Sequence, residues 1–221
     1  MAAPFWISII AIGIFLSAYA TTKLIRVKVF RFFGLSALIK AIADALFAIG
    51  WAARLIGYRM IYVATFTIAG FLILGIAIMI FWGVHEEIYV EKTELAIIFP
   101  IILLVVGERQ IPVSRTMTLM FGAFGTGLVF AASLFAIYGC YKLYTHRRGG
   151  AVIWALIGAY ALLIMIANTT GLLLMFYETL EWLTVYEVLM IHSSLLILPD
   201  IVAGFMAYYY EKRIKPLLTQ L

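Results

Sequence analysis

The stretch that decides the fold is VLMIHSSLLILPDIVAGFMAYYY, residues 188–210. An α-helix of about 20 apolar residues crosses a bilayer at a rise of about 1.5 Å per residue, and this stretch is long enough. Asp200 lies near its midpoint, where a carboxylate costs several kcal/mol unless it is paired or hydrated. Pro199 removes a backbone donor, which frees a carbonyl that also needs a partner. We therefore expect this face of the helix to point into a bundle rather than into lipid.

The composition of the whole chain agrees with this prediction. Of 221 residues, 66% are hydrophobic and 12% are charged, and the mean hydropathy is +1.10. A soluble domain carries roughly twice that share of charge, so the chain is an integral membrane protein. The N-terminus, MAAPFWISII, lacks the basic region of a secretory signal, and we expect it to be retained. One Asn and two Gln are a scarcity typical of thermophilic sources, although membrane spans also deplete amides.

Seven apolar runs follow one another along the chain. They lack the alternation of a β-barrel, so we predict helices at 5–20, 32–53, 60–84, 95–107, 117–141, 151–177 and 188–210. The fourth run has thirteen residues and contains Pro100, so it covers only about 20 Å of a hydrocarbon core of about 30 Å. This run could therefore be a tilted helix that extends into its polar flanks, a broken helix or a re-entrant segment.

The distribution of Lys and Arg predicts the orientation, because short cytoplasmic loops carry an excess of both. With seven crossings, eleven basic residues fall on the side of the C-terminus and four on the side of the N-terminus. The acidic loop 85–94 fits this poorly, but acids contribute little to orientation. We predict an all-α, polytopic transmembrane bundle of seven helices, forming one domain over 1–221. Its N-terminus lies outside and its C-terminus in the cytoplasm, in the plasma membrane of a prokaryotic cell.

Three ionisable residues stand out inside the predicted spans. Lys40 and Asp44 are four residues apart, on one face of a helix, and Asp200 falls at a similar depth in the last span. Together they could form a proton- or cation-binding centre. The alternative is structural, with Lys40 and Asp44 neutralising each other while Asp200 bonds to helix ends or to Ser193.

A second group of polar residues lies in the predicted outer half of the bundle. Several helices contribute to it, which predicts a water-accessible pocket for a small ligand or ion. Its members are Thr65, Thr67, Thr126, Asn168, Thr169, Thr170, Glu187, His192, Ser193 and Ser194. Against this interpretation, Ser and Thr often bond to carbonyls of their own helix.

Motifs of enzymes and cofactor proteins are absent from the sequence. It contains no HExxH, CxxC, GxSxG or phosphate-binding glycine motif. The three histidines fall at different depths, which disfavours a bis-histidine haem, and the last span has no lysine for a retinal Schiff base. We expect no cofactor, no metal and no catalytic residues, although a lipid-directed enzyme using His192 stays open.

These patterns favour a protein that acts by recognition, as a sensor-like or accessory subunit of a membrane complex with an outward-facing polar pocket. The alternative is a proton- or cation-coupled transporter or channel that uses Lys40, Asp44 and Asp200. Expected partners are the lipid bilayer, a small ligand or ion, and other membrane subunits or a second copy of the chain. The stripe Ala123, Gly127 and Ala131 suits either packing within the bundle or a homodimer contact. The net charge of +5 is explained by topology, and no nucleic acid is expected.

Overall fold

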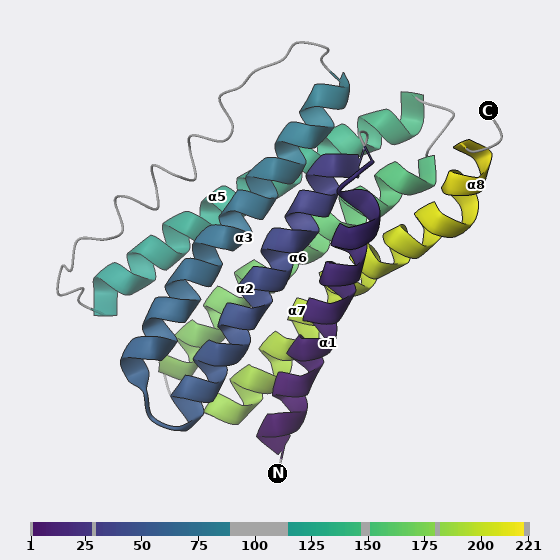
Figure 1. The fold of residues 1–221 in the computed structure, drawn as a ribbon. Coiled ribbons are helices and arrows are strands. Elements are labelled where there is room, and N and C mark those ends of the chain that lie inside the picture. Colours follow the sequence, from purple (N-terminus) through teal and green to yellow (C-terminus); the bar gives the residue numbers. More distant parts are fainter. Residues whose placement is uncertain (1, 28–29, 89–114, 147–150, 180–181, 219–221) are drawn as a thin grey trace.

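The computed structural model describes residues 2–27, 30–88, 115–146, 151–179 and 182–218, and the described residues form an all-helical bundle (Figure 1). Six long helices are followed by a π-helical turn, η3, and a short last helix. In chain order they are α1 (Ala2–Leu24), α2 (Arg31–Leu55), α3 (Arg59–Ile88), α5 (Arg115–His146), α6 (Ala151–Thr179), α7 (Val185–Tyr209), η3 (Tyr210–Ile214) and α8 (Lys215–Leu218).

The described residues contain six helices long and apolar enough to cross a membrane, not the seven predicted. Each coincides with one of the predicted spans other than the fourth. The fourth predicted span, 95–107, lies outside the described residues. The prediction of an all-helical, multi-pass membrane protein is confirmed. Helices suit hydrocarbon because a helix satisfies its backbone donors and acceptors internally.

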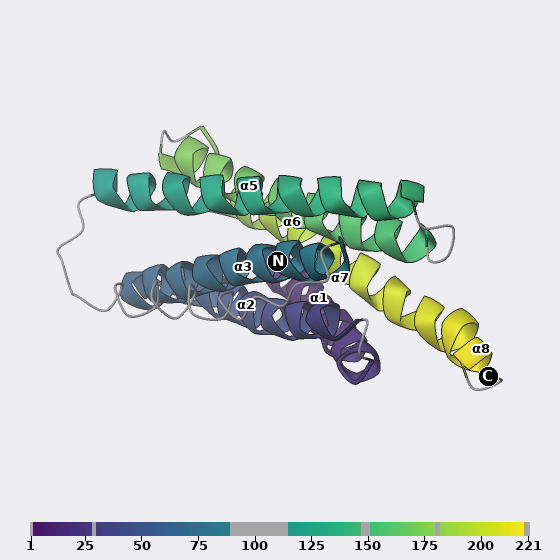
Figure 2. The ribbon, with the colours of Figure 1, turned by 90° about the horizontal axis from the view of Figure 1, so that it is seen from above.

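The six long helices pack as two layers of three (Figure 2). One layer holds α1, α2 and α3, and the other holds α5, α6 and α7. Within each layer neighbouring helices pack together, and α1 against α7 and α3 against α5 join the layers at their edges. The helices therefore close into a ring in which α7 lies beside α1 and near α2, and this neighbourhood positions the site described below.

The direction of the helices places the two chain ends at opposite ends of the bundle (Figure 1). The helices α3 and α5 run in the same direction, whereas α2 and α6 run in the opposite one. Ile88 at the end of α3 and Arg115 at the start of α5 consequently lie at opposite ends of the bundle.

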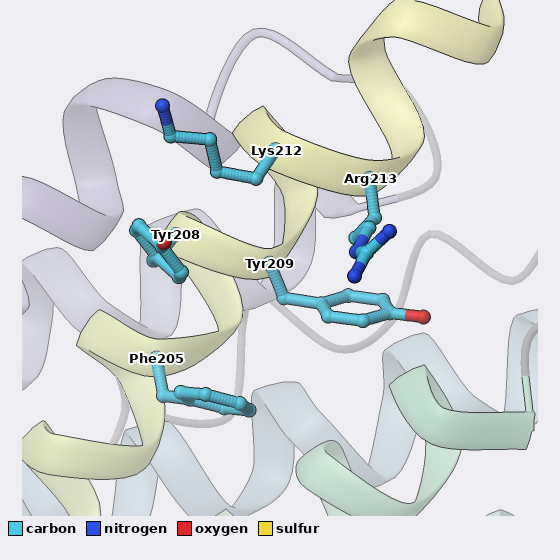
Figure 3. Close-up of a pocket in the computed structure, with 5 residues that line it drawn as sticks. All are labelled: Phe205, Tyr208, Tyr209, Lys212 and Arg213. Carbon is cyan, nitrogen blue, oxygen red and sulfur yellow. The ribbon is translucent and has the colours of Figure 1, made fainter.

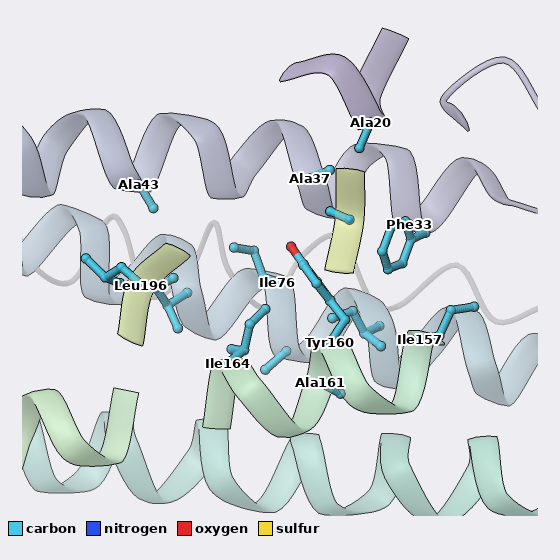
Figure 4. Close-up of a cluster of buried hydrophobic side chains, with 14 of the residues drawn as sticks. Ala20, Phe33, Ala37, Ala43, Ile76, Ile157, Tyr160, Ala161, Ile164 and Leu196 are labelled. Carbon is cyan, nitrogen blue, oxygen red and sulfur yellow. The ribbon is translucent and has the colours of Figure 1, made fainter. Parts of the chain in front are cut away.

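The interior is filled by aromatic and aliphatic side chains from both layers (Figure 4). Phe33 of α2 and Tyr160 of α6 are fully buried, and their ring centroids are 4.8 Å apart. Ala37 and Ala43 leave room on α2 for side chains from the opposite layer. Close packing by small and large residues is what holds helices together where lipid offers no hydrophobic driving force.

Two loop features fix the helix ends around this core. Gly57, between α2 and α3, has a φ of +87°, which a residue with a side chain rarely adopts. Thr184 caps α7, because its hydroxyl accepts from the Glu187 amide while the Glu187 carboxylate accepts from the Thr184 amide. This capping box sets where α7 begins, and so the depth at which its polar residues lie.

Candidate functional site

The structure brings Lys40, Asp44 and Asp200 together in one buried cluster. The Lys40 ammonium nitrogen, Nζ, is 2.6 Å from both carboxylate oxygens of Asp44 and 3.2 Å from Oδ2 of Asp200. It also donates to the carbonyl of Leu196, at 3.1 Å, one turn before Asp200 on α7. None of the three charged side chains is more than 1% exposed. The ammonium therefore has protein partners for all its hydrogens.

Helix α1 supplies two further members of the site that the sequence analysis did not identify. Ser17 donates from Oγ to Oδ1 of Asp200 at 2.5 Å. A Cβ atom on Gly13 would lie 2.5 Å from Oδ2 of Asp200, so only glycine leaves space for the carboxylate there. Gly13 and Ser17 are four residues apart and share one face of α1. That spacing of small residues was the sequence signal available to find them.

The charge of this cluster does not balance. One ammonium faces two carboxylates, which gives a formal charge of −1 if all three groups are ionised. Asp44 and Asp200 also act on each other electrostatically, in addition to their contacts with Lys40. An uncompensated charge in a buried site costs several kcal/mol, and one bound proton would remove it.

A buried tyrosine hydroxyl belongs to the same region. Tyr160 of α6 is fully buried, and its hydroxyl has no hydrogen-bond partner among the described residues. Figure 4 shows this hydroxyl pointing from α6 toward α2. Asp200 and Asp44 are the charged groups that act on it electrostatically. A buried polar group of this kind needs an explanation, such as a bound water or a functional role.

The residues predicted to form an outer pocket do not form a single group. Thr65, Thr67 and Ser194 donate to carbonyls of their own helices, those of Ile61, Val63 and Met190 at 2.8 Å each. These bonds match the alternative interpretation of hydroxyls that serve their own helix.

Glu187 is exposed and belongs to the α7 cap, so the structure does not bring it to the other polar residues. Asn168 and Thr126 form a separate pair between α6 and α5, in which the Asn168 amide donates to the Thr126 hydroxyl at 3.3 Å. The half-buried Thr170 follows on α6.

His192 is enclosed by aromatic rings rather than by polar groups. The indole nitrogen of Trp51 donates to its Nδ1 at 3.3 Å, and the rings of Phe47 and Phe66 lie 5.1 and 6.0 Å from it. On the remaining side, a Cβ on Gly171 would lie 3.2 Å from its Nε2. With Nδ1 acting as acceptor, the imidazole is neutral with its proton on Nε2.

Two hydroxyls of the predicted outer group lack partners among the described residues. They are those of Ser193, a fully buried residue of α7, and Thr169 of α6. Ser193 is seven residues from Asp200, two turns along the same face of α7, and lies about 10 Å away along the helix. The structural alternative allowed a bond from Ser193 to Asp200, but the hydroxyl that donates to Asp200 in the structure is that of Ser17.

A shallow pocket of about 500 Å³ lies at the C-terminal end of α7 (Figure 3). It is lined by Phe205, Tyr208, Tyr209, Lys212 and Arg213. Phe205 and Tyr208 are about half exposed, whereas Asp200 is fully buried, so the pocket opens on another face of α7 than the charge cluster.

The described residues contain no group of His, Cys, Asp and Glu arranged to hold a metal ion. Comparison with protein families, with curated proteins and with solved structures found no match, so the functional argument rests on the geometry of the cluster.

Proposed function

We propose that the protein is a proton-coupled membrane transporter or channel in which Lys40, Asp44 and Asp200 bind the transported or coupling proton. The supporting observation is the buried cluster with two carboxylates for one ammonium, each at most 1% exposed. A purely structural ion pair would need only Lys40 and Asp44. Asp200 adds a charge that stability alone does not require, and residues of this kind inside membranes are typically functional.

The position of the cluster between the two helix layers supports the same proposal. Lys40 and Asp44 belong to α2 in one layer, and Asp200 belongs to α7 in the other. A contact of 3.2 Å between Lys40 and Asp200 therefore links the layers, and protonation of Asp200 would weaken it. Many transporters bind their coupling ion near the bilayer midplane, where two helical units meet. Pro199, inside α7 and next to Asp200, gives that helix a point at which to bend.

The orientation belongs to this proposal as well, with the N-terminus outside and the C-terminus in the cytoplasm of a prokaryotic cell. It is supported by the chain ends at opposite ends of the bundle and by the excess of Lys and Arg on the side of the C-terminus. A passage of 95–107 through the membrane would complete seven crossings.

The orientation is tested by fusing the C-terminus to a fluorescent protein that fluoresces only in the cytoplasm, and we expect this fusion to fluoresce. A dark fusion at full expression would show the opposite orientation.

Substitution of Asp200 by asparagine should abolish proton movement and leave the fold intact. The variant keeps an acceptor for Ser17 and leaves Lys40 and Asp44 as a neutral pair, so stability should not fall. Protein in liposomes with an internal pH-sensitive dye should dissipate an imposed pH gradient, and Asp200→Asn should match empty liposomes. Glu187→Gln, which changes a carboxylate outside the cluster, is the matched control. Equal rates for wild type and Asp200→Asn would refute the proposal.

A second candidate is the recognition function, as a sensor-like or accessory subunit. Its support is the aromatic enclosure of His192, together with an exposed small-residue stripe at Gly127 and Ala131 of α5 that a partner helix or a second copy could cover. The hydroxyls bonded to their own helices weaken the case for an outer ligand pocket. Native mass spectrometry in lipid nanodiscs should show a dimer or a bound subunit if this candidate is correct.

A further inference from the structure

Two buried hydroxyls without partners among the described residues, those of Tyr160 of α6 and Ser193 of α7, lie at different levels of the bundle interior around the charge cluster. The helices run antiparallel, and Gly171 of α6 lies against His192 of α7. Counting eleven residues along each helix from that contact places Tyr160 level with Ala203, about one turn beyond Asp200. Ser193 lies two turns before Asp200. The cluster thus sits between Ser193, toward the end with the N-terminus, and Tyr160, toward the opposite end.

We propose that a chain of buried waters runs through the bundle interior beside α7, bonded to Ser193 on one side of the cluster and to Tyr160 on the other, and that the cluster exchanges its proton through it. Both hydroxyls belong to fully buried residues and have no partner among the described residues. Buried waters typically make about three hydrogen bonds to polar groups that protein atoms leave unsatisfied. The inference rests on the proposed function, because it describes how the proton arrives.

Other polar groups in the region explain why these two positions matter. Lys40 has donated all its hydrogens to Asp44, Asp200 and Leu196, so it offers nothing further to a water. The remaining acceptors are lone pairs on the two carboxylates, to which a water of the proposed chain could donate. Ser193 and Asp200 are about 10 Å apart along α7, a gap that a few waters spaced about 2.8 Å apart would bridge. Thr169, the third unpartnered hydroxyl, lies on α6 at the level of Ser193 and adds a bond for the outermost water.

In this arrangement the proton moves by relay, and no atom is oxidised or reduced. A water donates one proton to a carboxylate oxygen of Asp200 and accepts another from the next water along the chain. On release the acid returns the proton to the water on the side of Tyr160. The Tyr160 and Ser193 hydroxyls hold the terminal waters in line, so they are positioning residues rather than proton carriers.

The test is the rate at which the protonated carboxyl of the cluster exchanges its proton for deuterium, followed by its infrared carbonyl band after transfer to D₂O. Tyr160→Phe and Ser193→Ala remove only a hydroxyl, so each should slow the exchange roughly tenfold, because one hydrogen bond of the chain is lost. Ser133→Ala is the matched control. Ser133 is also buried and unpartnered among the described residues, but it belongs to α5, which contributes no residue to the charge cluster.

The outcomes separate the two proposals. If Asp200→Asn stops proton flux but Tyr160→Phe and Ser193→Ala exchange as fast as Ser133→Ala, the water chain is refuted and the proposed function stands. If the band is absent, the proposed function fails. The water chain is then judged by an experimental density map, in which ordered water beside the Tyr160 and Ser193 hydroxyls supports it and dry packing overturns it.

Discussion

Replacement of Lys40 by methionine should destabilise the bundle by about 3–5 kcal/mol, the typical cost of removing one partner from a buried ion pair. The ammonium is within 3.2 Å of three carboxylate oxygens, and without it Asp44 and Asp200, with the one proton that they share in the proposal, would carry a buried charge of −1 and no cation beside it. Methionine preserves most of the volume, so the loss reports charge rather than a cavity. We expect the apparent melting temperature in detergent to fall by roughly 10 °C.

Two controls separate this charge effect from a general sensitivity to substitution. The double variant Lys40→Met with Asp44→Leu removes the whole pair, and it should recover most of the lost stability, since apolar residues replace buried ion pairs at little cost. Lys23→Met removes a lysine whose 2.7 Å bridge to Glu211 is partly exposed, and it should change little. A Lys40→Met variant that melts like the wild type would show that the ammonium does not hold the carboxylates in place.

Substitution of Gly13 by alanine should disturb the cluster from the side of α1. The added Cβ would lie 2.5 Å from Oδ2 of Asp200, closer than van der Waals contact allows, so the carboxylate or α1 has to move. Overpacking of this kind costs about 1–3 kcal/mol. Because the same oxygen accepts from Lys40, we also expect proton flux to fall. Thermal unfolding and the liposome assay measure the two effects.

Gly75 provides the matched control for that substitution. It lies inside α3, and a Cβ there would meet no atom within 4 Å. Gly75→Ala should therefore leave flux unchanged and stabilise the helix by about 0.5–1 kcal/mol, the usual difference between the two residues in a helix. If Gly13→Ala and Gly75→Ala behave alike, the close approach of α1 to Asp200 has no functional role.

The sequence allowed prediction of the helical architecture and of part of the site, because both depend on local rules. Apolar runs long enough to cross the bilayer correspond to six described helices. The spacing of Lys40 and Asp44 placed them on one helix face, where the structure has them 2.6 Å apart. The depth of Asp200 followed from counting along its span.

The rest of the site depends on which helices are neighbours, and sequence spacing does not contain that information. Ser17 and Gly13 contact Asp200 because the ring places α1 beside α7. The outer threonines illustrate the converse problem. Thr67 is polar at a suitable depth, yet its hydroxyl bonds to Val63 of its own helix, and a sequence pattern does not distinguish that bond from a ligand contact.

The most direct measurement of the central claim is the infrared spectrum of the wild-type protein near neutral pH, in the region where the carbonyl of an uncharged carboxylic acid absorbs. We predict one such band from the interior, present in wild type and in Glu187→Gln and lost in both Asp200→Asn and Asp44→Asn, because the two carboxyls share a single proton. A spectrum without that band, or a band that survives both asparagine substitutions, would show that the Lys40 cluster holds no proton and would contradict the account.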